Sequence, residues 1–165
     1  LAQLNWQEQS PQQLHSLLKA LENQALTELP EAQWLPRRAR IDELLDTADL
    51  PHAWNVISAL HSDSDLLLAR AAKTLAGGCP LTGHLVWEQI KRAQKLSLAD
   101  VFRMEYAMSL NCCRHPEFPE GVRSRLIDKD HAPRWHWPDV TSIPQQVIDA
   151  HFAPAWDGAH PLADL

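Results

Sequence analysis

The sequence has little of what marks several common classes of protein. Glycine is scarce, at five in 165 residues. The one adjacent pair, Gly77-Gly78, is followed by no Gly-Lys-Ser/Thr, so it is not a phosphate-binding loop. No apolar run approaches the ~20 residues that a membrane-spanning helix needs. The first residues, Leu-Ala-Gln-Leu-Asn-Trp, lack the basic region and long apolar stretch of a secretory signal peptide. We therefore expect no membrane partner.

Cysteine and basic residues are also in short supply. The three cysteines are Cys79, Cys112 and Cys113, and an odd number with two adjacent does not form a disulfide framework. A reducing, cytoplasmic setting fits this usage. The formal net charge is -6, whereas nucleic acids and anionic membranes attract proteins with a basic stripe. We expect no nucleic-acid partner, although this charge leaves room for a local basic pocket that takes one phosphorylated ligand.

What the sequence does have is helix after helix, and no convincing strand. Leu14, Leu17, Leu18 and Leu21 recur at helical spacing after the capping pair Ser10-Pro11. Asp49, the turn Ser62–Asp65 and the pair Ser97 with Asp100 are typical of helix starts, and Gly77 follows a strong helix former. The expected helices run from Pro11, over 37–46, 51–60 and 66–76, from Pro80, from Ser97 to about Cys113, from about Pro119, and over 144–151. The predicted fold class is all-α.

Tryptophans and one acidic residue suggest how these helices pack. Trp34, Trp54 and Trp87 are expected to anchor helix contacts, and Trp135 and Trp137 to pin the tail to the core. The spacing predicts that Val101, Phe102, Met108 and Cys112 face inward. Glu105 falls on the same stripe. We interpret it as a structural ion pair or hydrogen bond, with Arg103 or Arg123 as candidate partners, in preference to a general base.

Cysteine and histidine do not form a convincing site in the sequence. Cys112-Cys-Arg-His115, with Cys79 and two later histidines, could be interpreted as a zinc site. Zinc, however, prefers two separated pairs of ligands, and small buried cysteines are common. Cys113 and His115 do not face each other on a helix, and no third group completes a nucleophile. We expect no metal ligand and no catalytic residue in this chain.

One segment carries more information than the rest. It begins Phe118-Pro-Glu-Gly-Val-Arg, continues Leu126-Ile-Asp-Lys-Asp130 and closes Pro133-Arg-Trp135. This segment resembles the C-terminal signature of the crotonase (enoyl-CoA hydratase/isomerase) superfamily. Its sequence is similar to that of the branch that hydrolyses 3-hydroxyisobutyryl-CoA. Shorter stretches with the same resemblance are Cys79-Pro-Leu-Thr82, Met104-Glu-Tyr106, Asp139-Val140, His151-Phe152 and Pro161-Leu162.

The resemblance implies a role for two residues of the signature. In the superfamily the lysine at the place of Lys129 reaches the phosphates of coenzyme A, often across a subunit contact. The residue at the place of Leu126 lies near the adenine, although the family usually has an aromatic residue there. We therefore name Lys129 and Leu126 as coenzyme A-binding residues. From spacing alone, Val122 and Leu126 point inward with Lys129 on the same face, and Lys129 could equally be a solvated charge at a helix end.

The resemblance also implies what surrounds this chain. Residues 1–165 would be the helical C-terminal portion of a crotonase-type α/β enzyme: 1–60 helical and weakly matched, 61–135 carrying the signature, and 136–165 a tail. The catalytic core is expected upstream and absent, so this chain alone is expected to be inactive. The implied parent hydrolyses a 3-hydroxyacyl-CoA thioester in valine degradation. Its partners would be an acyl-CoA substrate, the upstream core and a possible homo-oligomer, with no cofactor besides substrate coenzyme A. The alternatives are a hydratase or isomerase of the same superfamily, or a non-catalytic helical interaction domain.

Overall fold

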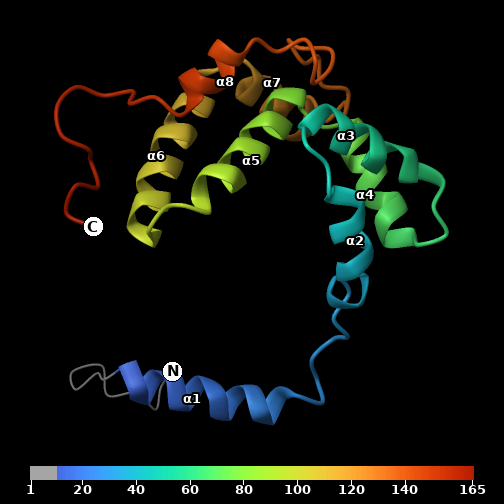
Figure 1. The fold of residues 1–165 in the computed structure, drawn as a ribbon, viewed down its shortest axis with the longest axis vertical. Coiled ribbons are helices and arrows are strands. Elements are labelled where there is room, and N and C mark those ends of the chain that lie inside the picture. The colour runs from blue at the N-terminus through green and yellow to red at the C-terminus, as the bar shows by residue number, and fades with distance from the viewer. Residues whose placement is uncertain (1–10) are drawn as a thin grey trace. The chain divides into compact units, whose positions relative to one another are not determined.

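Helices are the only regular elements in residues 11–165, which are the residues that this computed structural model describes (Figure 1). Their order is α1 (Pro11–Ala25), α2 (Arg38–Leu45), α3 (Leu50–Ala59), α4 (Leu66–Ala76), α5 (Pro80–Ala93), α6 (Leu98–Arg114), α7 (Glu117–Val122) and α8 (Gln145–His151). A π-helical turn, Arg123–Ile127, continues α7. No strand occurs over the described range, which confirms the all-α prediction. None of these helices has the length and apolar character needed to cross a membrane.

Capping side chains start three helices at the predicted residues. Asp49 accepts a hydrogen bond from the backbone N–H of His52 at 2.9 Å. Asp65 accepts from the N–H of Leu67 at 3.0 Å. Ser97 Oγ accepts from the N–H of Asp100 at 3.1 Å. Each bond satisfies a backbone donor that has no partner inside the helix, and so fixes where the helix begins.

The chain divides into two units between Asp42 and Glu43. In the first unit the four leucines with helical spacing all lie in α1, as predicted, although Ser10 lies outside the described residues. Leu14, Leu18 and Leu21 are exposed, and the first unit contains no buried residue in its described part. The expectation that Trp34 anchors a helix contact is wrong, because its side chain is 55% exposed beside a 3₁₀ turn.

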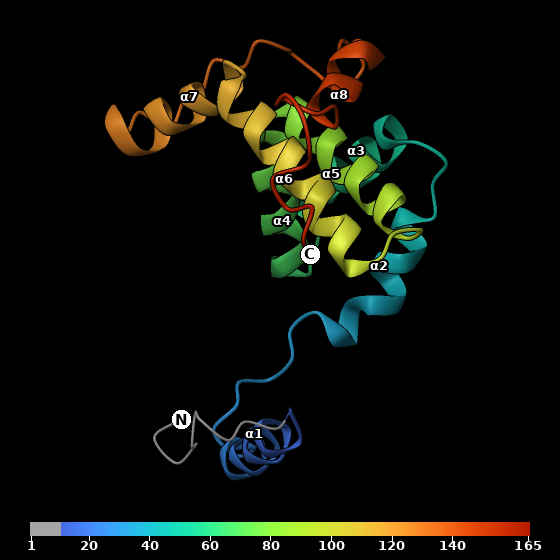
Figure 2. The same cartoon turned by 90° about the vertical axis from the view of Figure 1, so that its left-hand side faces the viewer.

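The second unit holds the core. Helices α5 and α6 lie side by side, and α8 packs against both (Figures 1 and 2). Leu81 and Leu85 of α5 meet Ile143 and Ile148, with Trp137 and other half-buried side chains packed around them. Trp135 Nε1 donates to the carbonyl of Gly77 at 3.4 Å. These contacts confirm that Trp135 and Trp137 hold the tail segment against the helices.

The first helices of this unit pack through small residues. Ala53 of α3 and Ala72 of α4 are fully buried. The Trp54 ring of α3 lies so close to Gly83 of α5 that a Cβ there would meet it at 2.6 Å. Trp54 therefore anchors a helix contact as predicted. The inward prediction is wrong for Phe102 of α6, which is exposed, whereas Ala107 of that helix is buried.

Polar contacts fix the chain after α8. Asn111 Nδ2 donates to the carbonyls of Ala150, His151 and Ala153. Tyr106 packs edge-on against Trp156 at 5.5 Å between ring centroids. The tail therefore follows α6 through hydrogen bonds and aromatic contacts instead of regular structure.

Candidate functional site

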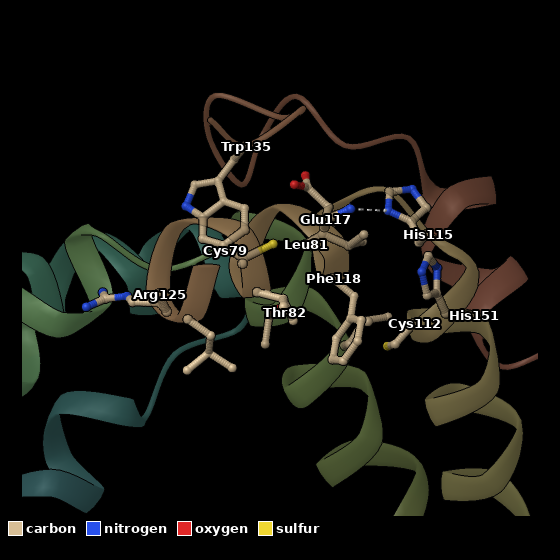
Figure 3. Close-up of a pocket in the computed structure, with 14 residues that line it drawn as sticks. Cys79, Leu81, Thr82, Cys112, His115, Glu117, Phe118, Arg125, Trp135 and His151 are labelled. Carbon is tan, nitrogen blue, oxygen red and sulfur yellow. Dashed lines mark hydrogen bonds between the residues drawn. The ribbon is translucent and has the colours of Figure 1, made fainter. Parts of the chain in front are cut away.

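A pocket of about 440 Å³ lies within the second unit, where α5 begins and α6 ends. Helix α7 and the π-helical turn supply one wall, and Trp135 and His151 come from later in the chain (Figure 3). Its volume falls in the usual range for small-molecule sites. The lining residues are Cys79, Leu81, Thr82, Leu85, Cys112, His115, Glu117, Phe118, Gly121, Val122, Arg125, Leu126, Trp135 and His151.

The walls of the pocket are mostly apolar and sulfur-bearing. Leu81 and Leu85 come from the buried core cluster, and Cys79 and Cys112 pack against the same cluster. Burial raises the pKa of the Cys112 thiol, and the neighbouring thiols of Cys113 and Cys79 add to the effect. Cys112 is therefore a protonated thiol at neutral pH, which is the form of an inert wall residue and not of a nucleophile.

Two histidines form one end of the pocket. Their rings, His115 after α6 and His151 at the end of α8, lie 5.0 Å apart between centroids. Burial lowers the pKa of His115, and the neighbouring His151 ring lowers it further. Nδ1 of His151 lies 2.7 Å from the carbonyl of Val147. Among residues 11–165, no group of three or more His, Cys, Asp or Glu side chains is placed to hold a metal ion.

Glu117 is buried beside this end of the pocket, and its carboxylate has a structural role. Both carboxylate oxygens accept the backbone N–H of His136, at 3.1 and 3.2 Å. The backbone N–H of Glu117 itself donates to His115 Nδ1 at 3.4 Å. Glu117 therefore ties the segment after Trp135 to α7 and orients the His115 ring.

Arg123 clasps the signature segment together. Its guanidinium makes a two-pronged contact with Glu120, and it also reaches Asp128 at 2.6 Å and Asp130 at 2.7 Å. These bonds raise the pKa of Arg123 above its ordinary value. The Arg123 hydrogen bond, aided by the backbone N–H of Arg134, lowers the pKa of Glu120 to about 2. We call Glu120, Arg123, Asp128 and Asp130 the arginine clasp.

The π-helical turn changes the expected face of the signature helix. A π turn holds an extra residue, so the side chains within it and beyond it rotate away from their α-helical positions. Leu126 is 68% exposed, and the prediction that it points inward is wrong, although it does line the open rim of the pocket. Arg125 lines the same rim and contacts His131 Nδ1 from Nη1 at 3.2 Å.

Lys129 lies beyond the helix end and not in its last turn. Its backbone is left-handed, with φ of 56°, and His131 repeats this conformation with φ of 53°. Such backbone is strained for residues other than glycine and persists only where surrounding bonds hold it. The arginine clasp supplies those bonds, and Lys129 is left exposed at the tip of the turn. A coenzyme A-binding role for Lys129 and Leu126 stays a prediction.

Glu105 has the structural hydrogen bond that its sequence position predicted, but from a different partner. Gln89 Nε2 of α5 donates to Glu105 Oε1 at 2.7 Å. The predicted arginine partners bond elsewhere: Arg103 with Asp100 and the carbonyl of Leu162, and Arg123 within the clasp. Gln89 was missed because helix spacing shows which residues share a face but not which facing helix supplies the partner.

A family model described as enoyl-CoA hydratase/isomerase matches residues 1–152. The chain belongs to the enoyl-CoA hydratase/isomerase family. The match covers most of the sequence, both units included, so the resemblance inferred from residues 118–135 is confirmed.

Relatives within this family are named 3-hydroxyisobutyryl-CoA hydrolase, mitochondrial. The one from Danio rerio is 35% identical over 98 residues, which are 59% of this chain and 26% of the relative. The one from Dictyostelium discoideum is 40% identical over 83 residues, which are 50% and 22%. The chain thus spans about a quarter of the length of these relatives.

A solved structure has the same fold. It is described as an enoyl-CoA hydratase from Rhodobacter sphaeroides, and it aligns with 25% identity and a TM-score of 0.66. The alignment covers 86% of this chain and 42% of that one. The helices described above therefore correspond to part of a known fold of this family.

Proposed function

We propose that this chain is the helical portion of an acyl-CoA thioester hydrolase that acts on 3-hydroxyisobutyryl-CoA or a close analogue. One observation supports this most directly. The segment whose sequence resembles the hydrolase branch, Phe118 to Trp135, supplies part of the wall of the pocket in the second unit. A sequence signature that folded away from any cavity would have no physical link to a small ligand.

In this proposal the chain binds and encloses the substrate, and residues outside it perform the chemistry. Among the described pocket residues we identify no activated nucleophile: Cys112 is held as a thiol, and the buried Glu117 carboxylate has a structural hydrogen bond with the N–H of His136. The upstream core of the parent would supply backbone amides that stabilise the thioester oxygen as it gains charge. A carboxylate there would act as nucleophile or base.

Lys129 and Leu126 would hold the nucleotide end of coenzyme A. The arginine clasp presents Lys129 at the tip of an ordered turn, and an exposed ammonium neutralises a phosphate without a fixed geometry. Leu126 on the pocket rim offers an apolar surface to the adenine but no ring on which it can stack. The same turn would lie at a contact with the core or with a second copy of the protein.

A hydratase or isomerase activity is the second candidate. It is favoured by the solved structure with the same fold, which is described as an enoyl-CoA hydratase. A third, a helical interaction domain without a ligand, is favoured by the exposed leucines of α1. The reaction that the parent performs separates the first two, since only the hydrolase releases free coenzyme A.

The deciding experiment is an assay of the intact protein on two substrates. A thiol reagent follows free coenzyme A released from 3-hydroxyisobutyryl-CoA, and the absorbance of the conjugated double bond follows hydration of crotonyl-CoA. We expect thiol release from the first substrate and no loss of absorbance from the second. Hydration without thiol release would overturn the hydrolase proposal, and inertness toward both would favour the interaction domain.

A further inference from the structure

Four large apolar side chains are exposed on two neighbouring helices of the second unit. Val86 and Ile90 of α5 are 47% and 59% exposed, and Leu98 and Phe102 of α6 are 72% and 49% exposed. A single exposed apolar side chain is ordinary, whereas a contiguous group of them marks a surface that binds something. We call these four residues the α5–α6 strip.

A hydrogen bond between the two helices shows that the strip is contiguous. Gln89 Nε2 of α5 donates to Glu105 Oε1 of α6 at 2.7 Å, so these two positions face each other. The two α5 members of the strip lie within one helical turn of Gln89. Phe102 lies three residues before Glu105, and Leu98 lies four residues before Phe102. Since α5 and α6 lie side by side and run in opposite directions, these neighbours share one face of the helix pair (Figures 1 and 2).

The strip leads to the open rim of the pocket. Thr82 lies one turn before Val86 on the same row of α5, and its exposed side chain lines the pocket. On α6 the row continues from Glu105 to Cys112, which also lines the pocket. Leu126 adds an exposed apolar side chain at the rim. A protein surface that covers the strip therefore also lies beside the mouth of the pocket.

We propose that the α5–α6 strip is the face on which the catalytic core of the parent protein docks, beside the mouth of the pocket. This rests on the proposed function, which places the bond-breaking groups outside these helices. The chain spans about a quarter of its hydrolase relatives, and its alignment covers 42% of the solved structure with the same fold. Each of those proteins therefore contains a large portion besides these helices, and docking at the strip brings that portion to the open side of the pocket.

A second copy of these helices is not the occupant that the pocket requires. It would bring another pocket in which we identify no activated nucleophile, so the site would still lack its catalytic group. The centre of the strip is also polar, because the Gln89–Glu105 pair lies there. Contacts between domains of one chain are more polar than the interfaces of obligate dimers. The inferred occupant is a mostly apolar face of the core.

Cysteine labelling of the intact protein tests whether the strip is covered. Ile90→Cys places a thiol on the strip, and Leu66→Cys places one on α4 at a position that is 82% exposed and outside the strip. The thiol at position 90 should react with a maleimide at least about tenfold more slowly than the thiol at position 66, because the reagent must reach it. Cys113 is present in both variants and serves as the internal reference. Equal rates at positions 90 and 66 would overturn the inference.

Cross-linking of the wild-type intact protein identifies the occupant and needs no variant. Lys91 and Lys95 are exposed next to the strip. An equal mixture of ¹⁴N and ¹⁵N protein is treated with a lysine-reactive cross-linker, and the linked peptides are identified by mass spectrometry. We expect links from these lysines to parts of the same parent chain outside residues 1–165, with both peptides carrying one isotope. Links that join ¹⁴N to ¹⁵N peptides, or an absence of same-chain links beyond residues 1–165, would overturn the inference.

Neither measurement depends on turnover. A covered strip with same-chain links in a protein that hydrolyses no thioester would therefore support the docking face and refute the proposed function. Thioester hydrolysis by a protein whose strip is freely labelled would refute the docking face alone.

Discussion

Lys129 lies at the tip of a turn whose backbone is held in the left-handed region, and its side chain is exposed. If it contacts a phosphate of coenzyme A, water and salt screen that contact, and its contribution is modest. Lys129→Ala in the intact protein should raise KM for coenzyme A thioesters roughly 3–30-fold, a change of about 0.7–2 kcal/mol. kcat should barely change, because the phosphate is bound equally in the ground and transition states.

Substrates provide the control for this prediction. Pantetheine thioesters lack the nucleotide, so their KM should be the same for Lys129→Ala and wild type. The effect on coenzyme A thioesters should also shrink with added salt. An unchanged KM for both substrates would mean that Lys129 is only a solvated charge on the turn.

Glu105 joins α6 to α5 through its hydrogen bond with Gln89. Because the partner is a neutral amide and not an arginine, substitution of Glu105 should reduce stability only by the contribution of a single hydrogen bond. Glu105→Ala should cost about 0.5–1.5 kcal/mol of unfolding free energy in urea denaturation, and kcat should stay within about twofold. A large loss of kcat with unchanged stability would show that Glu105 takes part in the reaction.

At the scale of elements, the arginine clasp joins α7 and the π-helical turn to the turn that carries Lys129. The pKa of Glu120 is about 2 in the folded protein, below its ordinary value of 4.5. A carboxyl with a lowered folded-state pKa stabilises the fold above its unfolded pKa, and that contribution is lost as the pH falls through the folded value. The clasp should therefore weaken between about pH 4.5 and 2.

Acid titration of amide NMR signals for residues 120–134 can follow this loss. Arg123→Ala should move the disordering of this segment to higher pH, because Glu120 and the two aspartates lose their shared cation. Arg38→Ala is the matched control, since Arg38 and Asp42 are both largely exposed and 3.5 Å apart. Identical acid profiles for Arg123→Ala and wild type would exclude the clasp as the element that orders the turn.

Helix α8 depends on one fully buried side chain. Ile148 is 2% exposed in the core cluster with Leu81 and Leu85. Ile148→Ala should cost about 2–5 kcal/mol, because the site loses buried methyl groups and retains a cavity. Leu66→Ala, at a position that is 82% exposed on α4, should change stability by about 0.5 kcal/mol or less. Similar urea midpoints for the two variants would contradict this account of the core.

The features that the sequence predicts correctly are the helix starts, because residues next to each other in the chain determine them. Asp49, Asp65 and Ser97 begin helices through bonds to their own backbone neighbours, so their patterns suffice. No comparable sequence pattern predicts the π-helical turn, and in that turn Leu126 lies on a different face from the one expected. The pocket joins α5, α6, α7 and α8, and His151 lies within it only because of long-range packing. The buried Nε2 of His151, which has no hydrogen-bond partner among residues 11–165, could not be inferred from spacing.

At the scale of the whole molecule, the chain spans about a quarter of its hydrolase relatives and contains a pocket without an activated nucleophile. In the proposed function these helices bind and enclose the substrate. Residues outside them perform the bond-breaking step. This division of labour is what the family membership and the chemistry of the pocket together support.

One comparison tests the division most directly: hydrolysis of 3-hydroxyisobutyryl-CoA by the intact protein and by the 165-residue chain alone, at equal concentrations, followed by thiol release. We predict that the intact protein releases free coenzyme A and that the chain alone does so only at the buffer rate. Hydrolysis above the buffer rate by the chain alone would contradict the account, because it would place the catalytic groups among these helices.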